Sequence, residues 1–146
     1  MTEQELRTIL RRQREYFATG ATLSWEFRAK QLGKLKASLQ CHEIELNDAL
    51  QQDLGKSRME SYMCEIGLTL SELTWMQKHL RGLMREKRVP TPLSQFAARR
   101  FRSPPPYGTV LIMSPRNYPV LFTLDPSLDA YASENTTGAN TRFYSQ

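Results

Sequence analysis

The residue of this chain best placed to do chemistry is Asn117, which lies in a short segment bounded by prolines. Residues 109–113 form an apolar run with β-branched members, which is typical of a buried strand. Pro115 and Pro119 fix the backbone on either side of the asparagine, and Pro119 suits the first turn of a helix. The sequence therefore predicts a strand, a tight turn and a helix. It also predicts that the uncharged amide of Asn117 lies at the carboxyl end of the strand, where open α/β sheets place ligand crevices.

Three blocks, in order along the chain, resemble the aldehyde dehydrogenase superfamily. Residues 106–119 are similar to P-x-G-x-V-L-I-I-S-P-W-N-Y-P, a pattern of the branch that acts on medium- and long-chain or aromatic aldehydes. Residues 49–57, followed by Glu60 and Tyr62, are similar to A-L-x-x-D-L-x-K-x, and residues 121–135 to a helix ending in A-x-A-x-G-N. The resemblance covers most of residues 5–136 and concerns only the amino-terminal part of a much longer enzyme.

The resemblance implies an α/β fragment in three parts. Residues 1–90 would be mainly helical. Residues 91–135 would hold an oligomerisation-type strand and the first strand–helix unit of a Rossmann-like parallel sheet, the start of the coenzyme-binding core. Residues 136–146 form a divergent tail, because the family continues here into an apolar strand with a Lys-Pro pair, whereas this segment is polar. The predicted strand at 109–113 is therefore expected to lack a parallel neighbour, and the isolated chain to fold poorly.

The family's reaction, as the resemblance implies it, is the NAD(P)+-dependent oxidation of an aldehyde to a carboxylic acid. A cysteine thiolate attacks the aldehyde carbon, NAD(P)+ accepts the hydride, and a glutamate activates the water that hydrolyses the thioester. Asn117 aligns with the asparagine of the family's oxyanion hole, where a neutral amide donor stabilises the developing alkoxide. The alternative is that Asn117 only satisfies the backbone of the turn, as asparagine often does.

Four further residues align with positions on the nicotinamide side of the family's cofactor cleft: Met113, Ser114, Pro115 and Arg116. Arg116 departs from the family, which has tryptophan there, and a guanidinium cannot reproduce the packing area of an indole. Pairing of Arg116 with the cofactor pyrophosphate is a second interpretation. NAD or NADP is the implied cofactor. Binding by this chain alone is not expected, because the lysine that holds the adenosine ribose in the family comes from a later strand.

The nucleophilic cysteine and the general-base glutamate of the family have no counterpart in this sequence. Cys41 and Cys64 fall on predicted helices upstream of the motif, and Cys64 is predicted to be a small core residue. Neither cysteine has metal-ligand spacing, and with only His42 and His79 besides them no metal site is predicted. The glutamates fit helix caps and solvated helix faces: Glu43, Glu45, Glu60 and Glu65.

Four amphipathic helices are predicted to precede the motif, because apolar residues recur at helical spacing between capping signals. They are expected over residues 2–20, about 22–40, about 43–54 and 57–86. The fourth predicted helix has an apolar stripe with simple helical spacing, which favours core packing over a ligand groove. The stripe consists of Tyr62, Ile66, Leu70, Leu73, Leu80 and Leu83.

Beyond these helices, residues 93–102 are predicted to be extended, with Phe96, Ala98 and Phe101 as packing residues. Comparable strands of the family belong to its oligomerisation sheet, so self-association through this edge is expected. A further helix is predicted over residues 119–133, bent at Pro126.

The composition is that of an ordinary globular domain: 146 residues, 40% hydrophobic and 24% charged. No apolar run is long enough for a membrane span, and the first residues do not read as a secretory signal, which favours a cytoplasmic protein. A net charge of +5 is compatible with nucleic-acid binding. We favour solvated cations at a helix end, among them Arg85, Lys87 and Arg88, and predict no nucleic-acid partner.

Three functional hypotheses remain open at this point. The chain is an amino-terminal aldehyde dehydrogenase fragment that is inactive alone, or one piece of a split enzyme completed by a second polypeptide. The third hypothesis is a small helical interaction protein that keeps the family's helices and its oligomerisation edge.

Overall fold

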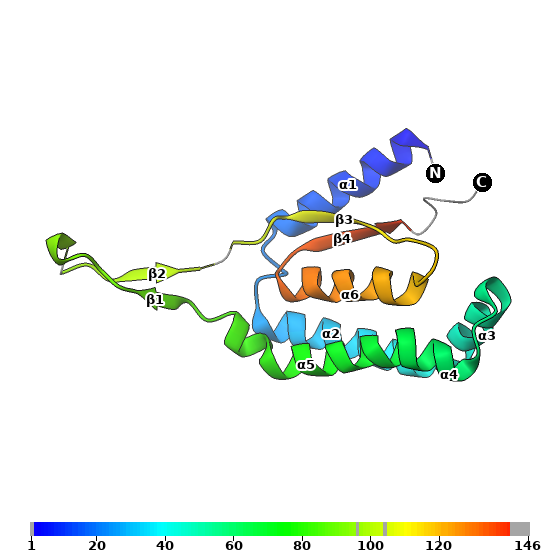
Figure 1. Ribbon diagram of the computed structural model, residues 1–146. Helices are drawn as coiled ribbons and strands as arrows, with labels where there is room; N and C mark the ends of the chain where they lie inside the picture. Colours follow the sequence, from blue (N-terminus) through cyan, green and yellow to red (C-terminus); the bar gives the residue numbers. More distant parts are fainter. Residues whose placement is uncertain (1, 96, 104, 141–146) are drawn as a thin grey trace.

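The computed structural model describes the chain from residue 2 to residue 140, apart from residues 96 and 104, and arranges it in layers (Figure 1). Two parallel strands, β3 (Thr109–Met113) and β4 (Thr136–Asn140), lie between α1 (Glu3–Ala18) and α6 (Pro119–Ala132). The mainly helical α/β fragment with a strand–helix unit, predicted from the sequence, is confirmed. No helix in this described part of the chain is long and apolar enough to cross a membrane.

The core lies where α6 meets α2 (Trp25–Cys41) and α5 (Gly67–Leu83), on the side of α6 away from the sheet (Figure 1). Its members recur at helical spacing, so that each helix presents one apolar stripe to the other two. Burial of each large aliphatic side chain stabilises the folded state by about 1.5–3 kcal/mol relative to leaving it in water. The buried residues are Leu32, Leu39, Ile66, Leu73, Met76, Leu80, Leu128 and Ala132.

The first three predicted helices are confirmed: α1, α2 and α3 (Glu43–Leu54). Thr2 and Glu5 form the expected reciprocal capping box of α1. Gly20 and Gly55 follow α1 and α3 with φ of 72° and 69°, the left-handed conformation that ends a helix at little cost for glycine.

The fourth predicted helix is interrupted by a wide turn. It begins as α4 (Arg58–Ser61), passes through the π-helical turn η1 (Tyr62–Ile66) and continues as α5. The Gly67 N–H donates to the Tyr62 carbonyl, five residues back, and a Cβ on Gly67 would lie only 2.8 Å from that oxygen. The extra residue shifts the face that points inward, so Ile66 is buried as predicted, whereas Tyr62 is exposed.

The helix also ends earlier than predicted. α5 stops at Leu83, whose side chain is exposed rather than part of the stripe, because Leu80 and Met84 on either side of it are the residues that pack against the core. Lys87 and Arg88, expected in the last helical turn, instead lie in β1 (Lys87–Val89), which pairs antiparallel with β2 (Arg100–Arg102). Prolines at 90 and 92 prevent continuation of the helix.

Residues 93–102 are only partly extended. Leu93–Gln95 forms a 3-10 turn that reverses the chain into β2. Phe96 lies outside the described residues, and Ala98 and Phe101 are exposed, so the packing predicted for these two does not occur within this chain. The β1–β2 hairpin extends away from the layered body (Figure 1).

The expectation that β3 lacks a parallel neighbour is wrong. β4 pairs with β3 along its whole length, from Thr109 opposite Thr136 to Met113 opposite Asn140. Backbone groups make this pairing, so the polar composition of the segment does not prevent it. The Asn135 side-chain oxygen also accepts from the Gly108 N–H at 2.8 Å, which fixes the register where the strands begin.

β3 is buried on one face only. Ile112 is buried, whereas Leu111 is 62% exposed, so the predicted buried strand is half correct. Leu111 lies opposite Gly138, whose missing Cβ points toward Gln13 of α1. α1 therefore covers this face at Gly138 and leaves the neighbouring side chain open.

Candidate functional site

Asn117 lies in the turn between β3 and α6, as the sequence predicts, and its side chain is exposed. Its backbone carbonyl accepts a hydrogen bond of 2.8 Å from the Lys56 ammonium. The described residues make no hydrogen bond to its side-chain amide. The amide is thus available to a ligand at the carboxyl end of the strand rather than engaged with the described turn backbone.

The four residues expected to line a cofactor precede Asn117 directly. Met113, Pro115 and Arg116 are exposed at the end of β3. Ser114 is buried, and its hydroxyl lies 3.3 Å from the Pro115 carbonyl. The strand and turn therefore offer three of these side chains to a ligand, while Ser114 supports the turn from within.

A buried ion pair lies beneath this turn. Glu65 has no exposed surface, and its Oε1 lies 2.5 Å from Nζ of Lys56, which is itself 8% exposed. The other carboxylate oxygen accepts from the backbone N–H groups of Val120 and Leu121, at 2.9 and 3.3 Å. One lysine and one glutamate thus join the connection between α3 and α4, the turn η1 and the start of α6 to the Asn117 turn.

This arrangement corrects the prediction that Glu65 belongs to a cap or a solvated helix face. Glu65 stands four and eight residues before Thr69 and Leu73, which are also fully buried, so it lies on the inner side of the helix. The residue signal that could have indicated it is the lysine of the 49–57 block, because a buried ammonium needs an acceptor nearby. Lys56 is the lysine of that block, and the resemblance implies no role for it.

Groups of positive charge or partial positive charge face the Glu65 carboxylate. The first turn of α6 carries the positive end of the helix dipole, and both of the amides that Glu65 binds belong to that turn. Lys56 also lies over the Tyr118 ring, 3.9 Å from its centroid, which is a cation–π distance. Because Glu65 already occupies these amides, this helix start is not open to a phosphate group.

The other candidate residues lie outside the turn. Cys41 is exposed at the end of α2, and Cys64 in η1 is half-buried and outside the core cluster it was expected to join. His42 and His79 are at the surface, each with Nδ1 2.8 Å from a carbonyl one helical turn earlier. Over residues 2–95, 97–103 and 105–140, no three His, Cys, Asp or Glu side chains cluster as metal ligands would.

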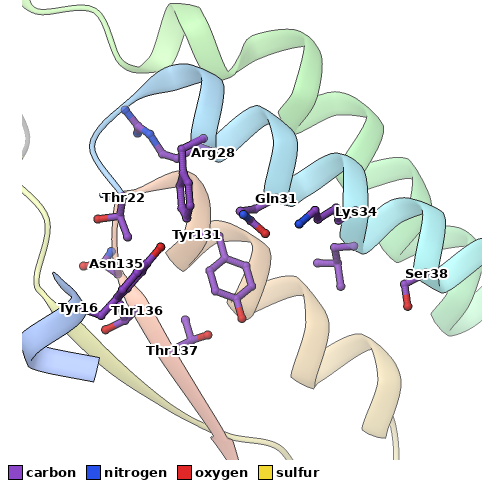
Figure 2. Close-up of a pocket in the computed structure, with 12 residues that line it drawn as sticks. Tyr16, Thr22, Arg28, Gln31, Lys34, Ser38, Tyr131, Asn135, Thr136 and Thr137 are labelled. Carbon is purple, nitrogen blue, oxygen red and sulfur yellow. The ribbon is translucent and has the colours of Figure 1, made fainter. Parts of the chain in front are cut away.

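A cavity of about 530 Å³ lies at the opposite, amino-terminal end of the two strands, between α2, β4 and the ends of α1 and α6. Figure 2 shows Tyr131 projecting from α6 into this space, with Gln31 and Lys34 on α2 beside it. Arg28 forms part of the wall, but its guanidinium donates to the carbonyls of Ala132 and Leu23, at 2.7 and 3.0 Å. This arginine therefore caps the carboxyl end of α6, and its hydrogen bonds are structural.

The fold and the site together define an α/β protein in which a strand–helix–strand unit, on a helical layer, presents one uncharged amide at the end of its first strand. Sequence comparison specifies the class further. Residues 1–139 match the profile of the "Aldehyde dehydrogenase family", and the chain belongs to that family. The predicted family is thus confirmed, and the match continues into β4.

Relatives agree with this assignment. The chain is 39% identical over 121 residues to the 4,4'-diaponeurosporen-aldehyde dehydrogenase of Staphylococcus aureus, covering 83% of this chain and 26% of that protein. It is 43% identical over 126 residues to the human aldehyde dehydrogenase family 3 member B1, covering 86% of this chain and 27% of that protein. The chain thus spans about a quarter of the length of these relatives.

A solved structure, the substrate-bound state of Staphylococcus aureus AldH, superposes with a TM-score of 0.89 at 35% identity. The superposition covers 95% of this chain and 30% of that one. Nearly all of the described chain therefore has the arrangement found in that structure.

Proposed function

We propose that this chain supplies the amino-terminal part of an NAD(P)+-dependent aldehyde dehydrogenase, in which the Asn117 amide is a donor of the oxyanion hole. The observation that carries the proposal is the exposed amide at the carboxyl end of β3, in a turn whose backbone is held by Lys56. Such a donor acts when it lies about 2.7–3.1 Å from the developing oxyanion. A neutral amide meets this need without a charge of its own.

The residues at the end of β3 fit one wall of a cofactor site. Met113, Pro115 and Arg116 would lie along the nicotinamide side, and bound NAD(P)+ would supply the hydride acceptor. The first-turn amides of α6 are taken by Glu65 and offer the pyrophosphate no binding site. We therefore propose that this chain alone holds neither NAD nor NADP measurably.

We also propose that this chain alone does not oxidise aldehydes, since the reaction needs a nucleophile and a base beside the amide. Cys41 and Cys64 lie on α2 and in η1, not in the Asn117 turn. The substrate class we propose is a medium- or long-chain or aromatic aldehyde, from the resemblance of residues 106–119 to that branch of the family. A cytoplasmic location stays a prediction from the sequence.

A chimera tests the proposal directly. Residues 1–139 of this chain would replace the corresponding quarter of the Staphylococcus aureus aldehyde dehydrogenase, and NADH formation from an aldehyde would be measured. We expect an active chimera and an inactive chain. Asn117→Ala should lower kcat about 100- to 1,000-fold, whereas the exposed-amide control Gln52→Ala should leave it unchanged. An Asn117→Ala chimera as active as its parent, or a folded but inactive parent chimera, would contradict the proposal.

A second proposal concerns self-association through residues 93–102. The β1–β2 hairpin extends from the body and exposes Leu93 and Phe101, and an exposed two-stranded edge is able to pair with another chain (Figure 1). Sedimentation of the chain and of Phe101→Ser tests this idea, and we expect the variant to shift toward monomer. A chain that stays monomeric at all concentrations would exclude it. Stable self-association in a chain that never complements an enzyme would instead favour a small interaction protein.

A further inference from the structure

We propose that Lys56 and Glu65 are positioning residues for Asn117, an inference that rests on the proposed function. Neither side chain is placed to touch a substrate, because both are buried beneath the turn. They act on the amide through the backbone that carries it.

The turn is held on both sides by one pair of side chains. Before α6, the Lys56 ammonium binds the Asn117 carbonyl at 2.8 Å. Within α6, the Glu65 carboxylate binds the Val120 and Leu121 amides. Because Lys56 and Glu65 also bind each other, a shift of the Asn117 peptide relative to α6 would break at least one of these contacts.

The neighbours of Asn117 are fixed as well. The Tyr118 ring lies against the Lys56 ammonium, and Ser114 is buried at the start of the turn. Pro115 and Pro119 limit the backbone between these points. The exposed part of the turn is therefore short. The part of it that is still able to rotate is the Asn117 peptide, whose carbonyl is bound by Lys56.

A buried ion pair is a costly way to stabilise a fold, since an apolar pair of similar volume often stabilises as well or better. The advantage of the ion pair here is that an ammonium and a carboxylate form directional hydrogen bonds to particular backbone atoms and so fix their positions, which apolar packing does not do. An oxyanion donor needs such a fixed position, because a misplacement of about 1 Å can lower the rate about 100-fold. The pair thus has the geometry of a support for the amide.

A double-mutant cycle in the chimera described above tests the inference. Lys56→Met and Glu65→Gln should each lower kcat by about 10- to 100-fold, with KM for aldehyde and cofactor unchanged within about twofold. In the Asn117→Ala background the same changes should cost little further, because the group they position is gone. A purely structural pair would cost the same factor in both backgrounds, and that result would overturn the inference.

The cycle also separates this inference from the proposed function. If Asn117→Ala lowers kcat but the Lys56 and Glu65 changes are independent of it, the positioning role fails and the oxyanion role stands. If Asn117→Ala has no effect, both fail. Lys30→Met, at an exposed position of α2, is the matched lysine control and should change neither kcat nor KM.

A measurement on the 146-residue chain itself covers the case in which a single variant unfolds. The double variant Lys56→Met with Glu65→Gln removes both charges and leaves no unpaired ion. Hydrogen exchange at the Val120 and Leu121 amides should become at least tenfold faster in it, while exchange in α5 stays unchanged. Unaltered exchange at these two amides would show that the pair does not hold the turn, and would overturn the inference.

Discussion

The Glu134 carboxylate lies 3.0 Å from the buried guanidinium of Arg28, although Glu134 has a φ of 71°. Glycine is the usual residue at such an angle, and the family pattern has glycine at this position. Burial lowers the pKa of Arg28, and the neighbouring Glu134 carboxylate opposes that shift. The strained glutamate thus supplies the counter-ion of an arginine that closes α6.

Removal of that charge should destabilise the fold. Glu134→Gln keeps the size of the side chain and leaves Arg28 with carbonyl partners only, so we expect a loss of about 1–3 kcal/mol in the free energy of unfolding. Urea denaturation measures it. The control is Glu15→Gln, whose pairing with Arg11 is a solvent-exposed contact of 3.7 Å, and its effect should stay within about 0.5 kcal/mol. Equal effects of the two changes would show that the buried pair is no stronger than a surface one.

The wide turn η1 depends on Gly67. Gly67→Ala would place a Cβ 2.8 Å from the Tyr62 carbonyl, and should cost about 1–3 kcal/mol through backbone displacement. Gly82→Ala in the same helix meets no atom within 4 Å and should instead stabilise by about 0.5–1 kcal/mol, as alanine favours helix. Thermal unfolding of both variants tests the pair. A neutral Gly67→Ala would mean that the turn can return to regular helix without loss.

Asp125 should make stability depend on pH. Burial raises its pKa, the nearby Thr69 hydroxyl opposes this, and the charges of Glu72 and Asp129 add to the rise. Because the folded state holds this proton more tightly than the unfolded chain, the contribution of Asp125 to stability falls as pH rises from the ordinary value of 3.8 through the raised folded-state value.

The Asp125→Asn variant provides the measurement. It should be more stable than the parent at pH 7, and this advantage should disappear below the ordinary carboxyl pKa of 3.8. Denaturation at several pH values would show the difference. Asp53→Asn, at an exposed position near the end of α3, is the control and should be neutral within about 0.5 kcal/mol at pH 7. An advantage of Asp125→Asn that persists at low pH would contradict the assignment to its charge.

Arg116 provides a test of the cofactor wall. Arg116→Trp should not give the isolated chain measurable affinity for NAD+ or NADP+, because one restored wall does not supply the pyrophosphate and ribose contacts. In the chimera the same change should tighten cofactor binding by about 3- to 10-fold through aromatic packing worth about 0.5–1.5 kcal/mol. Calorimetric titration measures both. Saturable binding by the isolated chain, with either residue, would reveal a cofactor site elsewhere in it.

The parts of the fold that local sequence determines were predicted well. α1, α2 and α3 appear where apolar spacing and caps place them, because those signals act within a few residues. Asn117 follows β3 for the same reason, since prolines bound its turn. The family pattern carried the remaining prediction, the aldehyde dehydrogenase assignment, which the comparisons confirm.

Contacts between distant residues were decided only by the tertiary structure. The carboxylate of Glu65 is bound by Lys56 and by amides more than fifty positions later, and no local pattern contains that information. The pairing of β4 with β3 depends on backbone groups, which have no signature in side-chain hydropathy. By itself, therefore, the sequence determined the helices, the family and the place of the Asn117 amide, because caps, spacing and motif are local. The support of that amide by Lys56 and Glu65 was decided by packing, which brings together groups that the chain keeps far apart.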